Sequence, residues 1–472
     1  MTKPVSKQKI FLVMAIGIIF MAVVPLIRVF FYESSLPLEM PYYDSLLSQH
    51  ISENGITRQE PFIQRYYAVQ PYHLLLVPFI KLIGNTALMI FPIVFGATSL
   101  IIFYHILKKL NFRHEKIFLI MLVLILTPNF IYTFSIAGSQ ALALMLALLT
   151  LYLFMLHKKQ YKILTVVLCA IAPLFNFLNA ALLLAVLLIF ALGEKTKLKQ
   201  LYSCAIATVA VIVFHAKMFG MPKLTTFLQK SMLRNFVADF GALTGFSLFN
   251  LLLALLGLYL VWRTRKYLLA YALLFLFIIA SLYTNAVHAH LNIIFALFAG
   301  TALLSLANMP WRIHAVKYLT IIILISGLAL STFSTMSVLA KSQPHNEIIE
   351  SLNWLKSHTS KEDKIFSHYT KGFWIESIAH RSVLLDSNLA STPNAAQLYN
   401  DSNTIFNSRN LETTTAILDK YSIDYIFIDK DMKSGQVWTE PEQGLQFILA
   451  NSEMFKKIYA KEGIEIWKYE KK

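Results

Sequence analysis

The chain of 472 residues is 57% hydrophobic and only 14% charged, whereas soluble domains average about 25% charged residues. Its mean hydropathy of +0.58 indicates a polytopic membrane protein. The net charge of +16 could suggest a nucleic-acid ligand. In a membrane protein, however, the position of each basic cluster matters more than the sum, so no nucleic acid is expected as a partner. Cys169 and Cys204, the two cysteines, lie in apolar runs, which argues against a disulfide framework or a cysteine zinc site.

The first apolar run, residues 10–32, is expected to stay in the protein as a membrane-spanning helix. It is longer than the hydrophobic core of a signal peptide, and no small-residue cleavage site follows it. Ten further runs bring the expected number of transmembrane helices to about eleven, each near the ~20 residues that a bilayer requires. These runs are residues 86–107, 117–133, 138–156, 161–174, 177–193, 201–216, 245–262, 267–283, 291–307 and 316–337.

Basic residues gather in alternate gaps between these runs. If the lysine-rich start MTKPVSKQK is cytoplasmic, the basic gaps KKLNFRHEK, HKKQYK, GEKTKLKQ, RTRK and MPWRIHAVK are cytoplasmic too, in agreement with the positive-inside rule. The sequence therefore predicts a multi-pass protein of the plasma membrane, with a cytoplasmic N-terminus and an extracytoplasmic tail.

Two domains are expected. Residues 1–340 form the transmembrane domain, in which the first outer loop, 33–85, carries a short apolar run at 71–84. This run is too short to cross and is expected to be a half-helix in or on the outer leaflet. Residues 341–472 form an α/β domain, with helices in HNEIIESLNWLKSH and GLQFILANSEMFKKIY and strands in DYIFID and GIEIWKY.

Four titratable residues of the first outer loop are the best candidates for chemistry: Glu39, Asp44, Glu60 and His73. A carboxylate there could bind a divalent cation, accept a proton from an acceptor hydroxyl, or stabilise a glycosyl transition state. The alternative is that these groups are solvated loop residues. The neighbouring tyrosines are either interfacial belt residues or sugar platforms; they are Tyr42, Tyr43, Tyr66, Tyr67 and Tyr72.

Further polar residues are expected on the outer side. His288 and His290 lie at the end of a span and could be ligands, phosphate contacts or interfacial histidines. Arg234 could hold a lipid phosphate or be solvated, and Asp239 could cap the next span. Lys217, Lys223 and Lys230 share the loop with Arg234.

The loop resembles that of the GT-C superfamily of membrane glycosyltransferases. EMPYYD and the later QPYHLLLVPFIKLIGNT carry this resemblance, which is strongest to the catalytic subunit of oligosaccharyltransferase and its archaeal relatives. Their loop has an acid followed by Pro, Tyr, Tyr and His. Here Tyr42 and Tyr43 match the tyrosine pair, Glu39 stands one residue further out than the family acid, and Asp44 replaces the histidine. Glu60 resembles a second acidic position.

The tail extends the resemblance. SLNWLKSHTSKEDKIFSHYTKGFWIESIAHRSVLLD is similar to the start of the soluble domain of oligosaccharyltransferase, in which a tryptophan-rich motif ending in Asp-Tyr-Gly grips the acceptor sequon. The corresponding stretch here, SHYTKGFWI, keeps Gly372 and Trp374 but lacks the tryptophan pair and the aspartate. The resemblance therefore implies a substrate-binding role for Gly372 and Trp374 without sequon recognition.

Together these features predict a polytopic α-helical membrane protein of the GT-C type with a C-terminal extracytoplasmic α/β domain. Its implied activity is transfer of a sugar or glycan from a polyprenyl-phosphate or polyprenyl-diphosphate carrier to an acceptor protein or lipid. Asp44 or Glu39 would be the base or the ligand of Mn²⁺ or Mg²⁺, Glu60 a second acid, and Arg234 a phosphate contact. The alternative is a non-catalytic descendant that binds a lipid-linked glycan or scaffolds a membrane complex. A transporter is disfavoured because the spans hold almost no charged residues.

Overall fold

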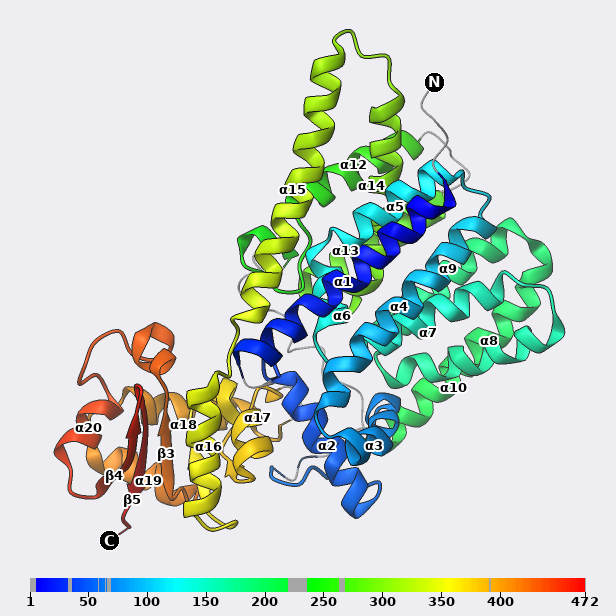
Figure 1. Ribbon diagram of the computed structural model, residues 1–472. Coiled ribbons are helices and arrows are strands. Elements are labelled where there is room, and N and C mark those ends of the chain that lie inside the picture. The colour runs from blue at the N-terminus through cyan, green and yellow to red at the C-terminus, as the bar shows by residue number, and fades with distance from the viewer. Residues whose placement is uncertain are drawn as a thin grey trace. The chain divides into compact units, whose positions relative to one another are not determined.

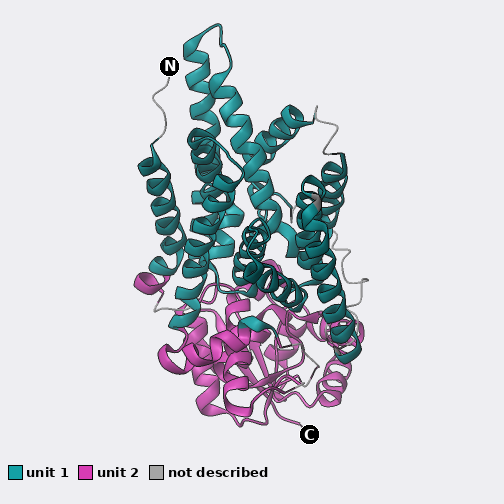
Figure 2. Cartoon of the chain, turned by 90° about the vertical axis from the view of Figure 1, so that its right-hand side faces the viewer, with its two compact units in different colours: residues 1–27, 70–72, 86–341 teal, residues 28–69, 73–85, 342–472 magenta. Residues whose placement is uncertain are grey.

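A computed structural model describes residues 6–32, 36–57, 59–63, 65, 69–219, 236–262, 268–389 and 392–471. The chain forms two compact units, coloured separately in Figure 2. The first comprises residues 1–27, 70–72 and 86–341, and the second comprises residues 28–69, 73–85 and 342–472. The second unit thus combines most of the first outer loop with the tail.

The first unit consists of apolar helices. Small residues allow some of them to approach closely: a Cβ added to Gly257 of α12 would lie 2.0 Å from the Phe298 carbonyl oxygen of α14. Close backbone approach of this kind is typical of helix packing within membranes. The helices are α1 (Lys7–Phe31), α4 (Thr86–Lys109), α5 (His114–Ile125), α6 (Pro128–Ser135), α7 (Ser139–Phe154), α8 (Lys159–Ile171), α9 (Phe177–Gly193), α10 (Leu198–Phe219), α12 (Leu248–Val261), α13 (Leu268–Tyr283), α14 (His288–Asn308) and α15 (His314–Ala340) (Figure 1).

Each of the eleven apolar runs expected from the sequence overlaps at least one helix. Within the described parts of the chain, five helices are long and apolar enough to cross a membrane, and the pair α5 and α6, bent by 68°, makes a sixth if it is one span. The break falls before Pro128, which has no N–H to continue a helix. The other expected spans are helices of 10–17 residues, so the number of eleven stays a prediction.

The second unit contains a five-stranded mixed sheet of order β2-β1-β3-β5-β4. β1 pairs in parallel with β2 and β3, whereas β5 is antiparallel to both β3 and β4. All four residues of β3 are buried, as expected for a central strand. The strands are β1 (Lys364–Phe366), β2 (Ser382–Val383), β3 (Tyr425–Ile428), β4 (Phe455–Lys461) and β5 (Ile464–Tyr469).

Helices surround this sheet, and its core is built from the apolar faces of both (Figure 1). Helix α16 was expected from the sequence, as were β3 and β5. The helix expected in GLQFILANSEMFKKIY is wrong in its second half, where β4 pairs with β5; sheet pairing outweighs the local helix preference there. The helices of this unit are α2 (Met40–Asn54), α3 (Pro71–Ile83), α16 (Asn346–His358), α17 (Gly372–Trp374), α18 (Ala395–Asn407), α19 (Leu411–Lys420) and α20 (Leu445–Asn451).

Candidate functional site

The EMPYYD stretch forms the start of helix α2. Glu39 is the N-cap residue and Pro41 lies in the first turn, where the fixed φ of proline suits a helix. Gly55, with φ of 74°, ends the helix. Since successive helical residues point about 100° apart, Tyr42 and Asp44 face opposite sides, and each side of α2 can serve a different purpose.

Asp44 and His73 form a buried pair. The His73 Nε2 atom lies 2.9 Å from Asp44 Oδ1, and the two residues are 3% and 4% exposed. The second carboxylate oxygen of Asp44, Oδ2, is buried and has no hydrogen-bond partner among the described residues. A buried acceptor without a donor is costly, so this oxygen is available to a substrate proton or a cation.

Next to this pair lies a buried ion cluster centred on Arg65. Its Nε is 2.6 Å from Glu60 Oε2, and its Nη1 is 2.6 Å from Asp386 Oδ1. The Tyr43 hydroxyl donates to the other Glu60 oxygen at 2.6 Å, and the Tyr43 ring stands edge-on to the His73 ring at 6.4 Å. Tyr43 therefore connects the ion cluster to the Asp44–His73 pair.

The cluster contains more carboxyl groups than cations. Glu376, on a π-helical turn at 375–379, is 2% exposed. Burial, and then the nearby charge of Asp386, raise its pKa well above the ordinary value, which favours the neutral form of the Glu376 carboxyl group. Burial also raises the pKa of Glu60, against the opposing Arg65 charge. Burial alone would lower the pKa of Arg65, but Asp386 and Glu60 outweigh it and raise that pKa, so the guanidinium stays charged.

Glu39 differs from the buried carboxyl groups in being half-buried. Its Oε2 accepts a hydrogen bond from the Ser387 hydroxyl at 2.5 Å. Burial raises the pKa of Glu39 to about 7, although the Ser387 hydrogen bond acts in the opposite direction. A carboxyl group with a pKa near neutrality can exchange protons at working pH, so Glu39 fits an acid–base role.

Two motif residues of the tail, Trp374 and Gly372, contact the residues that hold these carboxyl groups. The Trp374 indole N–H donates to the Leu38 carbonyl at 3.1 Å and so holds the residue before Glu39. A Cβ added to Gly372 would lie 2.6 Å from the Asp386 Cβ and 2.8 Å from the Leu385 carbonyl oxygen. Only glycine allows this approach, so the structure gives both residues contacts that position the acids.

Other candidates from the sequence lie elsewhere. The Tyr42 hydroxyl accepts the Leu36 N–H at 3.1 Å, on the side of α2 away from Asp44. His288 lies between the carbonyl oxygens of Thr244 and Ser281, at 2.9 and 2.8 Å. His290 is buried in the first unit. Arg234, with Lys223, Lys230, Tyr66 and Tyr67, lies outside the described residues.

The expected cap at Asp239 is confirmed, because its Oδ2 accepts the N–H of Leu248, the first residue of α12, at 2.6 Å. Four residues of the site were missed from the sequence: Arg65, Glu376, Asp386 and Ser387. The only local signal was that Asp386 directly follows the apolar run VLL. The loop and the tail meet only through the tertiary fold.

A metal ion has partial support from these side chains. Where the structure places residues, no group of three or more His, Cys, Asp or Glu side chains converges on one point. Of the two expected ligands, Glu39 is bonded to Ser387, whereas Asp44 presents its unpaired Oδ2. Mg²⁺ can bind through one or two carboxylates and keep several waters, so Asp44 is the residue that could hold a cation.

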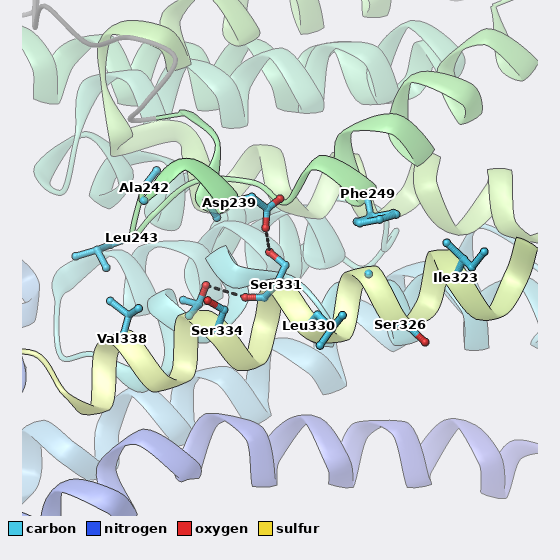
Figure 3. A pocket seen from close by; sticks show the side chains of 14 residues that line it. Asp239, Ala242, Leu243, Phe249, Ile323, Ser326, Leu330, Ser331, Ser334 and Val338 are labelled. Atoms are coloured by element: carbon cyan, nitrogen blue, oxygen red, sulfur yellow. Dashed lines mark hydrogen bonds between the residues drawn. The ribbon is translucent and has the colours of Figure 1, made fainter.

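The first unit carries a groove of about 610 Å³ along one face of α15 (Figure 3). Asp239 forms part of its wall and accepts a hydrogen bond from Ser331 at 2.6 Å. Leu330, Ile323 and Val338 are largely exposed beside it. The lining residues are Ala238, Asp239, Gly241, Ala242, Leu243, Phe249, Ile323, Ser326, Gly327, Leu330, Ser331, Ser334, Thr335 and Val338. The surface is therefore apolar with scattered hydroxyl groups.

No protein-family model matches this sequence, and neither does any curated protein sequence. Solved structures do match. The oligosaccharyltransferase AglB from Archaeoglobus fulgidus, in complex with an inhibitory peptide and a dolichol-phosphate, is 13% identical with a TM-score of 0.62, over 98% of this chain and 74% of AglB. An oligosaccharyltransferase from Archaeoglobus fulgidus solved in complex with zinc and sulfate is 16% identical with a TM-score of 0.62, over 97% of this chain and 73% of that chain.

Two other matches are proteins with different names. ArnT from Cupriavidus metallidurans, bound to undecaprenyl phosphate, is 10% identical with a TM-score of 0.58, and 98% of each chain is covered. The mycobacterial arabinofuranosyltransferase AftD is 13% identical with a TM-score of 0.62, over 100% of this chain and 40% of AftD. At these identities the likeness is one of fold. It confirms the resemblance to the GT-C superfamily at that level.

Proposed function

We propose that this chain, which has the fold of GT-C glycosyltransferases, transfers a sugar or glycan from a polyprenyl-phosphate or polyprenyl-diphosphate carrier to an acceptor on the outer face of the plasma membrane. The observation that carries the proposal is the buried Asp44–His73 pair, with one carboxylate oxygen unpaired, on the helix whose N-cap is the half-buried Glu39. Dolichol-phosphate and undecaprenyl phosphate in the matching structures support a lipid-linked donor.

The chemistry assigned to this pair is an inverting displacement. The acceptor oxygen or nitrogen forms a bond to the anomeric carbon, and the bond from that carbon to the carrier phosphate oxygen breaks. The phosphate leaves with the electron pair, and the acceptor proton passes to Asp44 Oδ2. His73 orients the carboxylate through Oδ1, which fixes the direction of the accepting oxygen.

Glu39 is the second candidate for the base, because its pKa lies at about 7. Glu60, expected to be a second acid, has one oxygen bonded to Tyr43 and the other paired with Arg65. We therefore assign it a positioning role. If Asp44 Oδ2 instead holds Mn²⁺ or Mg²⁺, the cation would supply positive charge for the leaving phosphate, and Glu39 would accept the proton.

The groove along α15, within the first unit, suits an apolar lipid chain. Its exposed apolar side chains would face lipid in a membrane, where a branched isoprenoid chain can fill the space between them (Figure 3). The basic gaps of the sequence support a cytoplasmic N-terminus and an extracytoplasmic tail. Either a protein or a lipid could be the acceptor, and the altered tail motif disfavours a sequon.

The test is a transfer assay in proteoliposomes with radiolabelled polyprenyl-phosphate sugars, Mn²⁺ or Mg²⁺ and membrane extracts as acceptors. Asp44→Asn is expected to lower transfer at least ~100-fold, in line with the loss of a general base, while retention of the labelled lipid stays unchanged. Glu412→Gln changes an exposed acid of α19 and is the control. If Asp44→Asn and Glu39→Gln both transfer normally, the site assignment is wrong. If the wild-type protein retains the lipid but transfers nothing, the non-catalytic binder replaces this proposal.

A further inference from the structure

The second unit, called here the loop-and-tail unit because it combines most of the first outer loop with the tail, has a cavity on the opposite side of α2 from Asp44. The cavity has a volume of about 310 Å³, at the small end of the ~300–1,000 Å³ typical of small-molecule sites. Tyr42 and Gln49, seven residues apart, share this side of α2. The other walls come from α16, the π-helical turn and the residue before α4; the lining residues are Leu36, Tyr42, Gln49, Asn85, Ile349, Asn353, Lys356, Ser377, Ile378 and His380.

Most of these side chains are polar, and none is a carboxylate among the lining residues that the structure describes. Three of them, Gln49, Asn85 and Asn353, are amides, each of which can donate and accept hydrogen bonds at the same time. Within the described chain, the side chains of Asn353, Lys356 and Ser377 form no hydrogen bond with another residue. The cavity therefore offers unused amide and hydroxyl groups together with one positive charge, that of Lys356.

Neighbouring residues hold two of the amides in place. The Ser45 hydroxyl donates to Asn85 Oδ1 at 2.7 Å and accepts from Gln49 Nε2 at 3.3 Å. This arrangement leaves the Asn85 NH₂ group and the Gln49 carbonyl oxygen for a ligand. One donor and one acceptor fixed side by side match the adjacent hydroxyl groups of a sugar ring.

Arg381 fixes the wall of the cavity that is formed by the end of α16 and by His380. Its guanidinium donates to the carbonyl oxygens of Lys356 and Thr359, at 2.8 and 2.6 Å, and to that of His380 at 3.0 Å. These bonds join the end of α16 to the residue after the π-helical turn. The side chains of Asn353 and His380 are thus presented from a braced backbone, so less ordering is needed when a ligand binds.

We infer that this cavity is a carbohydrate-binding site, separate from the acid cluster, that takes one or two sugar units through side-chain amides and the Ser377 hydroxyl. Tyr42 supplies an aromatic wall, and Lys356 lies exposed at the edge. The site would hold a part of a glycan that does not react. It goes beyond the transfer reaction, because binding here requires no lipid-linked donor.

Binding is measured by isothermal titration of the full chain in nanodiscs with the methyl glycosides of glucose, mannose, galactose and N-acetylglucosamine. At least one is expected to bind with a Kd of about 1 mM, as for a few net hydrogen bonds. Asn353→Ala is expected to weaken that sugar about fivefold, and Asn353→Trp to abolish binding by filling the cavity. Asn403→Ala and Asn403→Trp make the same changes at an exposed asparagine of α18 and are expected to bind normally.

Two comparisons separate this proposal from the transfer reaction. Asp44→Asn is expected to bind the sugar as well as the wild type, so a loss of transfer leaves this site intact. The proposal is overturned if no glycoside binds, if Asn353→Trp binds as the wild type does, or if inorganic phosphate binds and the sugars do not. The last result would make the cavity an anion site centred on Lys356.

Discussion

Replacement of Arg65 by methionine tests the electrostatics of the loop-and-tail unit most directly. Arg65 is the only cation in contact with Glu60 and Asp386 among the described residues, at 2.6 Å from each. Methionine keeps much of the apolar stem and removes the charge, so both carboxylates stay buried without a counter-ion. Loss of one partner from a buried pair costs about 3–5 kcal/mol.

The lost free energy of unfolding should appear as a lower melting temperature. At about 2–4 °C per kcal/mol, Arg65→Met is expected to lower the Tm by roughly 6–20 °C near pH 7.5, measured by intrinsic fluorescence in detergent. Arg409→Met removes an exposed arginine whose guanidinium lies over the Phe447 ring. This substitution is expected to lower the free energy of unfolding by no more than a surface interaction would, about 1 kcal/mol, and so to change the Tm only slightly.

The difference in Tm between Arg65→Met and the wild type should depend on pH. Without the guanidinium, no positive charge opposes the effect of burial on Glu60, so its pKa in the folded protein rises further above that in the unfolded chain and the folded variant binds more protons. Its stability then falls as pH rises, and the Tm deficit should be smaller near pH 5 than near pH 8. Neutralising both acids as well, in Arg65→Met/Glu60→Gln/Asp386→Asn, should recover part of the loss. An equal Tm for Arg65→Met and the wild type, or a triple variant less stable than the single one, would falsify this account.

Three further outcomes are expected. If Glu39 is the base, transfer rises with pH through about 7, the pKa of its carboxyl group, and this limb is absent in Glu39→Gln; a wild-type profile that is flat there would remove Glu39 from the chemistry. Since that pKa is raised on folding, the wild type should lose stability as pH rises from about 4.5 to 7 relative to Glu39→Gln, as thermal unfolding at several pH values can show. Gly372→Ala should cost about 1–3 kcal/mol, because the new Cβ overlaps Asp386, whereas Gly193→Ala, with open space around its Cβ, should leave the Tm unchanged. Chelation with EDTA should weaken transfer by the wild type if a cation at Asp44 is used, and retention of the lipid then serves as the readout for intact protein.

Much of the architecture was predictable because it depends on local composition. Long apolar runs become helices wherever a chain must satisfy its own backbone in lipid, and α4 and α15 lie where the sequence placed them. The apolar run in DYIFID and the pattern of GIEIWKY likewise indicated β3 and β5. The exception is β4, whose residues form a strand because they pair in antiparallel with β5, from Phe455 opposite Tyr469 to Lys461 opposite Ile464.

The candidate acids were also visible in the sequence, since Glu39, Asp44, Glu60 and His73 stand out in an otherwise apolar chain. The environment of these side chains in the folded protein was not visible in the sequence. Because α2 is a helix, Asp44 points toward His73, and Tyr42 points toward the cavity on the other side of the helix. Arg65 and Asp386 are 321 residues apart, and no local pattern predicts their contact.

The sequence by itself thus determined the class of the protein and the kinds of residue available for chemistry, because hydropathy and residue type are local properties. The tertiary structure alone decided which carboxyl groups are paired, which have a raised pKa, and which keep an oxygen without a hydrogen-bond partner. Those properties depend on burial and on neighbouring charges brought from distant parts of the chain.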